Sequence, residues 1–402
     1  MRQWILVVAV AFCLPIEESL AFAPTTNPQC RATTVLNMAV TSQPAQTSLG
    51  QSLLNFALES PLWKYVLVPQ ARKKIVNTAQ ENGIPWIKSL EWLSNQDGPW
   101  KVNSKLETQN IPTYYKKSFH SYEDGNLCWD AALEVELASC AVGARNFPAF
   151  GPRGEEAFRG AFASIFENEF KVVVPDQAVM VDLGCGTGMS TRPLAKMYPQ
   201  AKQIIGFDMS PYFVAVGQKL LELSPRSFLE GGSWVSNIDY DDRIDYRVAD
   251  ASDTGLPAES VDVVNVQFVV HELPIEISMK IMDEAYRILK PGGQLWVGEM
   301  DFEAPGYAAQ RANSLLFALI RATEPYLDVY AEGQTLLREH IARKFSTTRV
   351  AAATGRHYAL LATKHSRQED ATSPGKLSDE RFDLNGVYKV EDTHLKVWEN
   401  KA

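Results

Sequence analysis

Apolar residues follow two different periods along this chain of 402 residues, and the change of period divides the chain into two regions. In the first region, apolar positions recur every three to four residues, which is the spacing of amphipathic helices. Proline residues punctuate this pattern, as they do at helix boundaries. We therefore predict that residues 51–171 form a helical amino-terminal cap. The positions that carry the pattern are Leu53, Leu54, Ala57, Leu58, Leu62, Val66, Leu67, Ile87, Leu90 and Leu93, with prolines at Pro61, Pro69 and Pro85.

The second region starts near residue 172, where short β-branched runs begin to alternate with helical stretches. Strands that alternate with helices indicate a parallel sheet covered on both faces. We therefore predict an α/β, doubly wound, mostly parallel sheet of seven strands over residues 172–364. The expected strands are 179–183, 203–207, 261–266 and 293–298, the expected helices are 192–197, 212–221 and 277–289, and 347–352 and 358–363 are expected to form a terminal hairpin. Residues 365–402 are predicted to be a carboxyl-terminal extension, in which the charged segment 366–382 is a surface linker.

The amino terminus has the features of a targeting sequence. An apolar run from Trp4 to Leu14 follows Arg2 and is too short to span a membrane, but it fits the apolar region of a signal peptide. The following residues, from Phe22 to Leu58, contain no Asp or Glu and are rich in Ser, Thr, Ala and Pro, as transit peptides are. This order resembles the bipartite plastid presequence of algae, with a signal peptide at 1–21 and a transit segment at 22–50, and predicts a plastid-stroma protein. Secretion is the alternative.

Composition narrows the possible partners. The formal net charge of −9 disfavours binding to nucleic acid, and no Lys/Arg run exceeds two residues. Two of the five cysteines, Cys13 and Cys30, lie in the predicted presequence, and the other three show no paired spacing. The body therefore has the cysteine usage of a protein from a reducing compartment. No metal site and no integral membrane span are expected, and the oligomeric state stays open.

A glycine-rich segment at the end of the first predicted strand is the main indication of a ligand site. Residues 179–188 read V-M-V-D-L-G-C-G-T-G, in which Gly184, Gly186 and Gly188 alternate with other residues. Glycine is needed where the backbone turns sharply and a ligand approaches closely. The dinucleotide fingerprint would place its third glycine at position 189, which is Met189 here, so an NAD-dependent oxidoreductase is disfavoured.

Three acidic residues follow three successive predicted strands. Asp182 precedes the glycine turn, Asp208 ends the second strand, and Asp250 follows Tyr246-Arg247-Val248-Ala249. A carboxylate at the end of the second strand can accept both ribose hydroxyls of an adenosine, and Asp250 can accept the adenine amine. Asp182 is expected beside a methionine ammonium. These groups suit a cationic adenosine ligand without phosphates.

At this point the sequence resembles the class I S-adenosylmethionine-dependent methyltransferases. The segments D-L-G-C-G-T-G, G-F-D-M-S, V-A-D-A and R-I-L-K-P-G-G are similar to the family's successive signature segments and span about residues 175–300. The resemblance implies S-adenosyl-L-methionine as the cofactor and a Rossmann-like fold. The cofactor-binding residues that it implies are Asp182, Gly184, Cys185, Gly186, Gly188, Asp208, Met209, Asp250, Ala251 and Gln267. Outside this core, Y-Y-K-K-S-F-H-S-Y-E-D-G-N-L-C-W and E-P-Y-L-D-V-Y resemble segments of a plastid and cyanobacterial methyltransferase-like group.

The sequence indicates the residues that would bind the methyl acceptor less clearly than those for the cofactor. The fourth strand ends in N-V-Q-F, without the prolines and tyrosine of N-P-P-Y, which disfavours the family branch that methylates amide or ring-exocyclic nitrogen. His271 is a candidate general base, although a histidine there also commonly caps a helix or lines a pocket. Tyr122, Glu299 and Tyr326 are candidate acceptor-pocket residues, and packing or solvation explains them equally well. An aromatic cluster is predicted to form a lid, although packing of the helical region explains its rings equally well; it comprises Tyr114, Tyr115, Phe119, His120, Tyr122 and Trp129.

The sequence thus predicts methyl transfer to a small-molecule acceptor in the plastid. Two alternatives stay open. The first is a non-catalytic scaffold or sensor that binds S-adenosylmethionine. The second concerns only the acceptor: the core is moderately similar to methyltransferases that act on prenylated quinones and tocopherol precursors.

Overall fold

The computed structural model describes residues 68–102, 106, 111–119, 122–229, 240–307, 324–368 and 375–389. The predicted presequence, residues 1–50, lies outside the described residues, as does the start of the predicted cap. None of the described helices is long and apolar enough to cross a membrane. Within the described part, Cys128, Cys140 and Cys185 are free.

The amino-terminal region is helical, as its apolar spacing predicts. It comprises α3 (Val68–Glu81), α4 (Trp86–Asn95), α5 (Trp129–Asn146) and α6 (Gly154–Ser164), with short turns at η2 (Pro99–Val102), η3 (Pro148–Arg153) and η4 (Ile165–Glu169). Leu93 and Leu137 are fully buried in a core that also contains Tyr212 and Phe213 of the helix after β2. The cap therefore shares a core with the sheet domain.

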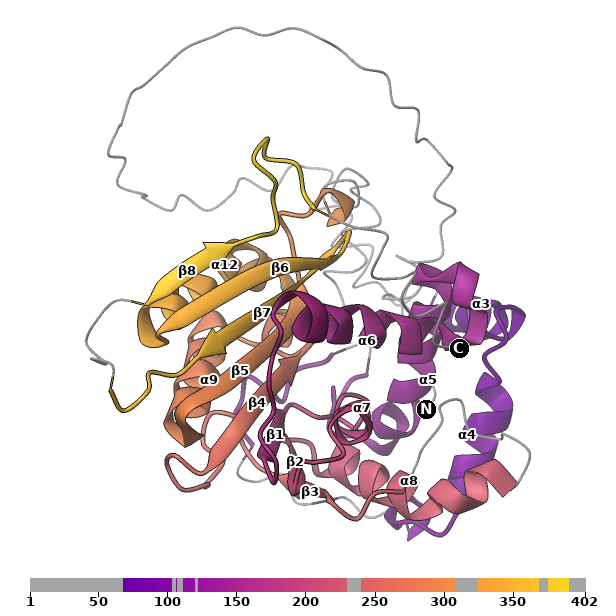
Figure 1. The fold of residues 1–402 in the computed structure, drawn as a ribbon. Helices are drawn as coiled ribbons and strands as arrows, with labels where there is room; N and C mark the ends of the chain where they lie inside the picture. Colours follow the sequence, from indigo (N-terminus) through magenta and orange to yellow (C-terminus); the bar gives the residue numbers. More distant parts are fainter. Residues whose placement is uncertain are drawn as a thin grey trace, which may run out of the picture.

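The second region forms one sheet of eight strands in the order β3-β2-β1-β4-β5-β7-β6-β8 (Figure 1). The strands are β1 (Val179–Leu183), β2 (Gln203–Asp208), β3 (Ile244–Val248), β4 (Val261–Gln267), β5 (Leu289–Met300), β6 (Thr347–Thr354), β7 (His357–Thr363) and β8 (Lys376–Asp379). The first five strands run parallel, and β7 lies antiparallel between β5 and β6. The predicted α/β class, Rossmann-like sheet and terminal hairpin are confirmed.

The predicted strand number was wrong by one. The additional strand, β8, lies within the segment predicted to be a surface linker and pairs in parallel with β6. All four of its residues are exposed, so the segment lacks the alternation of apolar and polar positions by which a half-buried strand is found in a sequence. The carboxyl-terminal extension thus contributes to the sheet.

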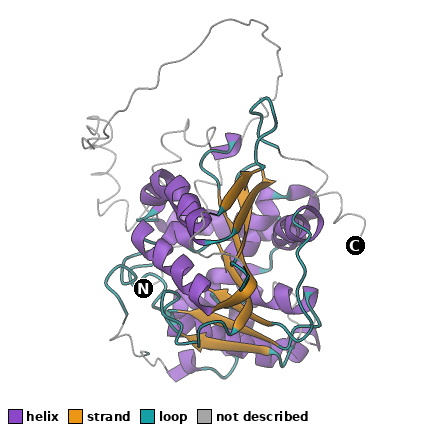
Figure 2. Cartoon of the chain, turned by 60° about the vertical axis from the view of Figure 1, so that its left-hand side comes forward, coloured by secondary structure: helices purple, strands orange, loops and turns teal. Residues whose placement is uncertain are grey.

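Helices cover both faces of the sheet, as Figure 2 shows. They are α7 (Thr191–Met197), α8 (Pro211–Leu229), α9 (Ile275–Ile288) and α12 (Leu327–Lys344), with a short turn at η5 (Val270–Glu272). Strand residues alternate between the two layers: Val181 and Leu183 pack with α9 and α12, whereas Met180 packs with α6 and α7. Because β1 lies between β2 and β4, the chain changes direction at β1, and open sheets of this type bind ligands at the carboxyl ends of the strands at that point.

A buried ion-pair network fastens the carboxyl-terminal extension to the end of β5. Arg381, which is 3% exposed, contacts Asp301 at 2.8 Å and Asp379 at 2.6 Å. The Tyr388 hydroxyl donates to the same Asp301 carboxylate at 2.8 Å. Asp301 is fully buried and follows Met300 directly, so the extension supports the carboxyl end of β5.

We expect Arg381→Ala to lower the free energy of unfolding by about 3–5 kcal/mol, because Asp301 would stay buried without its cation. Arg153→Ala is the matched control. Its pair with Glu156 is half-exposed, and exposed pairs contribute at most about 1 kcal/mol. Chemical denaturation of both variants measures the difference. Equal, small losses would show that the network does not stabilise the fold.

Candidate functional site

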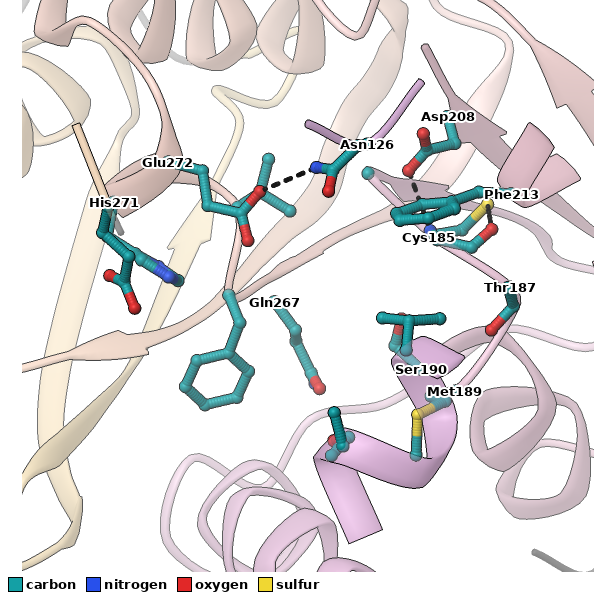
Figure 3. Close-up of a pocket in the computed structure, with 18 of the residues that line it drawn as sticks. Asn126, Cys185, Thr187, Met189, Ser190, Asp208, Phe213, Gln267, His271 and Glu272 are labelled. Atoms are coloured by element: carbon teal, nitrogen blue, oxygen red, sulfur yellow. Dashed lines mark hydrogen bonds between the residues drawn. The ribbon is translucent and has the colours of Figure 1, made fainter. Parts of the chain in front are cut away.

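A cavity of about 350 Å³ lies between the carboxyl edge of the sheet and the cap. Its walls come from the glycine loop after β1, the ends of β2 and β4 and η5, whose residues are labelled in Figure 3, and from the cap helices α5 and α6. Of the sequence-predicted site residues, ten line this cavity: Tyr122, Gly184, Cys185, Gly186, Asp208, Met209, Asp250, Ala251, Gln267 and His271. Asp182, Gly188, Glu299 and Tyr326 do not.

The glycine loop turns tightly because its three glycines have positive φ. The φ angles are 73° at Gly184, 56° at Gly186 and 100° at Gly188, a region that other residues rarely adopt. The amides of Gly184 and Cys185 both donate to the Phe207 carbonyl, at 2.8 and 3.0 Å, which ties the loop to β2. A Cβ atom added at Gly186 would have Phe213 as its nearest neighbour, at 4.0 Å. The loop therefore leaves open space for a ligand above its backbone.

Asp182 lies beneath the loop and does not line the cavity; its place beside a ligand ammonium, directly or through water, stays a prediction. Its side chain is fully buried and accepts hydrogen bonds from Ser190 at 2.7 Å, Thr191 at 2.6 Å and Asn265 at 2.7 Å. Burial raises the pKa of Asp182, and these donors lower it in part. In this structure Asp182 holds β1, β4 and the far end of the loop together.

Asp208 faces the loop from the end of β2. Its Oδ2 accepts the Gly186 amide at 2.9 Å, and its Oδ1 accepts the Ser210 amide at 2.8 Å and the Tyr115 hydroxyl at 3.3 Å. Burial raises the pKa of Asp208 to about 6, and the two backbone donors oppose this rise. The carboxylate is therefore mostly ionised at neutral pH and can accept further hydrogen bonds. Tyr115 was predicted only as part of a lid.

Asp250, Ala251 and Met209 continue the wall along the ends of β2 and β3. The Asp250 carboxylate accepts hydrogen bonds from the Ser252 amide at 2.8 Å and the Ser252 hydroxyl at 2.7 Å through its Oδ1 atom. These bonds fix the direction of the carboxylate. Gly188, in contrast, lies against Tyr246 and supports the turn from outside the cavity.

A polar chain that the sequence did not predict runs from the cavity wall, where Arg159 and Gln267 lie, to Asp182 beneath the glycine loop. Arg159 of α6 donates to Gln267 at 2.8 Å, Gln267 donates to Asn265 at 3.2 Å, and Asn265 donates to Asp182. Arg159 also pairs with Glu155 at 2.9 Å. The chain explains the orientation of Gln267, and it connects a cap helix to β4.

A second buried contact connects the cap to the glycine loop. Glu136 of α5 accepts the Thr187 hydroxyl and the Arg192 guanidinium, both at 2.8 Å, and Arg192 also donates to the Thr187 carbonyl at 2.8 Å. All three side chains are buried. No motif indicates this pairing, because its partners lie more than 50 residues apart. Only the helical spacing of Glu136 on α5, considered together with the sequence of the glycine loop, could have suggested it.

His271 forms a buried ion pair with Glu299, at 2.8 Å between Nδ1 and Oε1. Burial lowers the pKa of His271, but Glu299, Glu324 and Glu272 raise it more strongly, to about 10. At neutral pH the imidazole therefore already carries its proton. A general base needs a free nitrogen lone pair at the working pH, so this protonation disfavours the role of general base for His271, which stays a prediction. Glu299, predicted to line an acceptor pocket, instead lies behind His271 and also accepts the Val270 amide at 3.2 Å.

Glu272 has a pKa closer to the physiological range. Burial raises it to about 8, with contributions from Glu324 and Asp208 and an opposing effect of His271. Asn126 Nδ2 lies 3.5 Å from the Glu272 carboxylate (Figure 3), and both residues line the cavity. An acid that exchanges its proton near pH 8 on a cavity wall fits acid–base chemistry. This property could not be found from the sequence, because the pKa of Glu272 depends on Glu324, Asp208 and Glu299, which are distant in the chain.

The predicted aromatic lid divides into two groups. Tyr114, Tyr115 and Tyr122 line the cavity, and the Tyr122 hydroxyl donates to Glu134 at 2.8 Å. Trp129 instead packs edge-on against Tyr212, with ring centroids 4.7 Å apart, inside the cap core. His120 lies outside the described residues. Tyr326 donates to the Tyr114 carbonyl at 3.1 Å and supports the lid from outside the cavity.

Comparison with known proteins identifies the domain. Residues 181–297 match the family described as methyltransferase domain. The chain is 27% identical to the arsenite methyltransferase of Rattus norvegicus over 185 residues, which are 44% of this chain and 46% of that protein. It is 30% identical to the ubiquinone/menaquinone biosynthesis C-methyltransferase UbiE of Hydrogenovibrio crunogenus over 121 residues, which are 30% of this chain and 41% of that protein.

Two solved structures of methyltransferases match at low sequence identity. Haemonchus contortus phosphoethanolamine N-methyltransferase 1, in complex with phosphoethanolamine and S-adenosylhomocysteine, matches with a TM-score of 0.38 and 16% identity, over 55% of this chain and 46% of that chain. A methyltransferase described as putative from Bacillus halodurans matches with a TM-score of 0.30 and 18% identity, over 51% of this chain and 99% of that chain.

The predicted resemblance to methyltransferases is thus confirmed for the central domain, residues 181–297. The chain spans less than half the length of the two curated relatives described above. The plastid subgroup, the domain boundaries and the roles of single site residues stay predictions.

We expect Glu299→Gln to lower the pKa of His271 markedly, because burial would then outweigh the weakened attraction to carboxylates. NMR of the nitrogen-labelled histidine ring measures this pKa. Glu276→Gln, an exposed change on α9, is the control and leaves it near 10. A His271 that still loses its proton near pH 10 in Glu299→Gln would show that the ion pair is not the cause.

Proposed function

We propose that this chain, which carries a methyltransferase domain at residues 181–297, transfers a methyl group from S-adenosylmethionine to a small-molecule acceptor. One observation carries the proposal: the glycine loop leaves open space and faces the buried Asp208 carboxylate. Both lie beside β1, where the order of the strands reverses. A carboxylate there suits ribose hydroxyls and repels phosphate. The NAD-dependent alternative is not supported, because position 189 is Met189 and not glycine.

The cavity wall offers complementary groups along the length of an adenosyl ligand. Gly184, Cys185 and Gly186 are placed to lie against its amino-acid part, and Asp208 to accept ribose hydroxyls. Asp250 and Ala251, at the end of β3, are placed for the adenine. When bound, the sulfonium supplies an activated methyl group, and in-line displacement depends mainly on alignment and exclusion of water. The lid tyrosines Tyr114 and Tyr115 lie on the same cavity and support that exclusion.

Glu272 is our proposed general base in place of His271. An acceptor that loses a proton on methylation needs a group that can accept it, and Glu272 on the cavity wall has a pKa of about 8. His271 stays protonated, and its ion pair with Glu299 positions η5, on which Glu272 lies. Glu272 would then receive the proton as the new bond to the methyl carbon forms.

The acceptors named for the relatives differ, so those names alone do not identify the acceptor here. Arsenite is disfavoured, because a soft metalloid prefers thiolate ligands and Cys185 is the one cysteine that lines the cavity in the described part of the chain. Burial raises the pKa of Cys185 well above its usual value, so its thiol stays protonated. A prenylated-quinone or tocopherol precursor stays a candidate acceptor, in line with the similarity to UbiE.

Two further parts of the proposal concern location and catalytic competence. The apolar and acid-free segments at residues 1–50 support a plastid protein, and secretion is the alternative. A non-catalytic scaffold that binds S-adenosylmethionine is the runner-up function. Incubation with methyl-labelled cofactor and algal extract separates the two, because only an enzyme yields a labelled product.

We expect Asp208→Ala to weaken binding of S-adenosylmethionine and S-adenosylhomocysteine by about 1.5–3 kcal/mol, the contribution of hydrogen bonds to a charged group. Asp245→Ala, a half-exposed aspartate on β3 that pairs with Arg247, is the control and leaves affinity unchanged. Isothermal titration calorimetry measures both. No heat from the wild-type protein at sub-millimolar ligand would remove the proposed function.

For an acceptor that loses a proton, we expect kcat/KM to rise with pH through about 8. The reason is that Glu272 is protonated below its raised pKa and becomes able to accept a proton above it. The Glu272→Gln variant should show no such rise, and its kcat should be about 10²–10⁴-fold lower. Its affinity for S-adenosylhomocysteine should be unchanged. Glu276→Gln should keep the wild-type profile. An unchanged pH profile in Glu272→Gln would assign the proton transfer to another group.

A further inference from the structure

We propose that the acceptor of this enzyme carries a carboxylate on a flat apolar body, and that Arg356 recognises the carboxylate. This inference rests on the proposed methyl transfer and specifies the class of acceptor. Arg356 lies in the tight turn between β6 and β7 and lines the cavity.

The backbone and side chain of Arg356 are both held in place. Its carbonyl accepts the Asp301 amide at 2.8 Å, and its amide donates to Thr354 Oγ1 at 3.2 Å. Its guanidinium donates from Nη2 to Asn146 Oδ1, at the end of α5, at 2.8 Å. An arginine on a cavity wall whose backbone and guanidinium are both held by hydrogen bonds needs little reordering to bind a ligand.

Arg356 differs in its ion pairing from the other cationic side chains on this wall. Arg159 pairs with Glu155 at 2.9 Å, and His271 pairs with Glu299 at 2.8 Å. Among the described residues, Arg356 forms no ion pair within 4.0 Å, and its side-chain partner Asn146 is neutral. A guanidinium has five N–H donors and binds carboxylates through two parallel hydrogen bonds. An anionic group of the acceptor would supply the missing counter-charge.

The remaining acidic groups on this part of the wall do not offset that preference. Burial and nearby carboxylates raise the pKa of Glu272 to about 8, and burial raises that of Glu324. The carboxyl of Glu272 is therefore mostly neutral at pH 7, and burial disfavours the charged form of Glu324. Asp301, which is next to Met300, is already paired with Arg381. The wall around Arg356 thus favours an anion over a cation.

The wall next to Arg356 is aromatic. The rings of Phe158 and His357 lie with centroids 5.0 Å apart, and Phe268 lies 5.0 Å from Phe158 and 5.5 Å from His357. Burial and the adjacent Arg356 hold the pKa of His357 well below its usual value, so its ring is neutral. Phe158, Phe268 and His357 all line the cavity. They suit a planar aryl or conjugated alkenyl group through ring contacts.

Matched probes test the inference. Benzoate, cinnamate and sorbate, each with its primary amide, and benzylamine are titrated into the full chain saturated with S-adenosylhomocysteine. We expect at least one carboxylate to bind about 10-fold or more tightly than its amide and than benzylamine, because only the carboxylate forms charge-assisted hydrogen bonds. Arg356→Gln should remove this difference and Arg356→Lys should restore part of it. Arg247→Gln, a half-exposed arginine on β3, should keep it.

The outcomes separate the two proposals. Carboxylates that bind no better than their amides, or a preference that survives in Arg356→Gln, would overturn the inference while leaving methyl transfer intact. A wild-type chain that does not bind S-adenosylhomocysteine would instead overturn the proposed function. Unchanged S-adenosylhomocysteine affinity in Arg356→Gln shows that the variant is folded, so a lost preference then reports the acceptor site alone.

Discussion

The site depends on one fully buried carboxylate. Asp182 cannot stay in the interior without hydrogen-bond donors, and it finds them on Ser190, Thr191 and Asn265. Those donors belong to the far end of the glycine loop, the start of α7 and the neighbouring strand β4. The requirement to satisfy this single group therefore sets the loop against the sheet, and the loop in turn sets the backbone that faces Asp208. Asp182 matters for the site although it does not line the cavity.

The parts of the site that could be predicted are those that lie next to one another in the chain. The glycine loop and the residues at successive strand ends meet because parallel strands bring their carboxyl ends to one edge. The unpredicted parts are contacts between distant elements. Arg159 reaches Gln267 over 108 residues, and the pKa of Glu272 depends on neighbours from three other segments. A short stretch of sequence carries no information about contacts between segments so far apart in the chain. The eighth strand was missed for another reason: every residue of β8 is exposed, and its place in the sheet depends on pairing with β6 and on the ion pair between Asp379 and Arg381.

Ion pairing divides the cavity into two electrically different parts. Near the glycine loop, Asp208 keeps its negative charge because backbone amides stabilise it against burial. Near η5, the charge of His271 is cancelled by Glu299, and the carboxyls of Glu272 and Glu324 are shifted toward their neutral forms. A cationic ligand is therefore favoured at the end near the glycine loop. At the end near η5, Arg356 is the prominent charge. This separation suits a reaction in which a positively charged donor meets an acceptor of opposite charge.

The contact between Tyr115 and Asp208 has a consequence for the order of binding. Each oxygen of a carboxylate has two lone pairs, and on Oδ1 of Asp208 the Ser210 amide and the Tyr115 hydroxyl occupy both. The Gly186 amide occupies one on Oδ2, so a single vacancy is left. A ligand with two adjacent hydroxyls can fill that vacancy with one of them, and the other must displace the phenol. Occupation of this position would thereby detach the Tyr115 hydroxyl from Asp208, so a second substrate that binds afterwards would meet a Tyr115 ring without this bond.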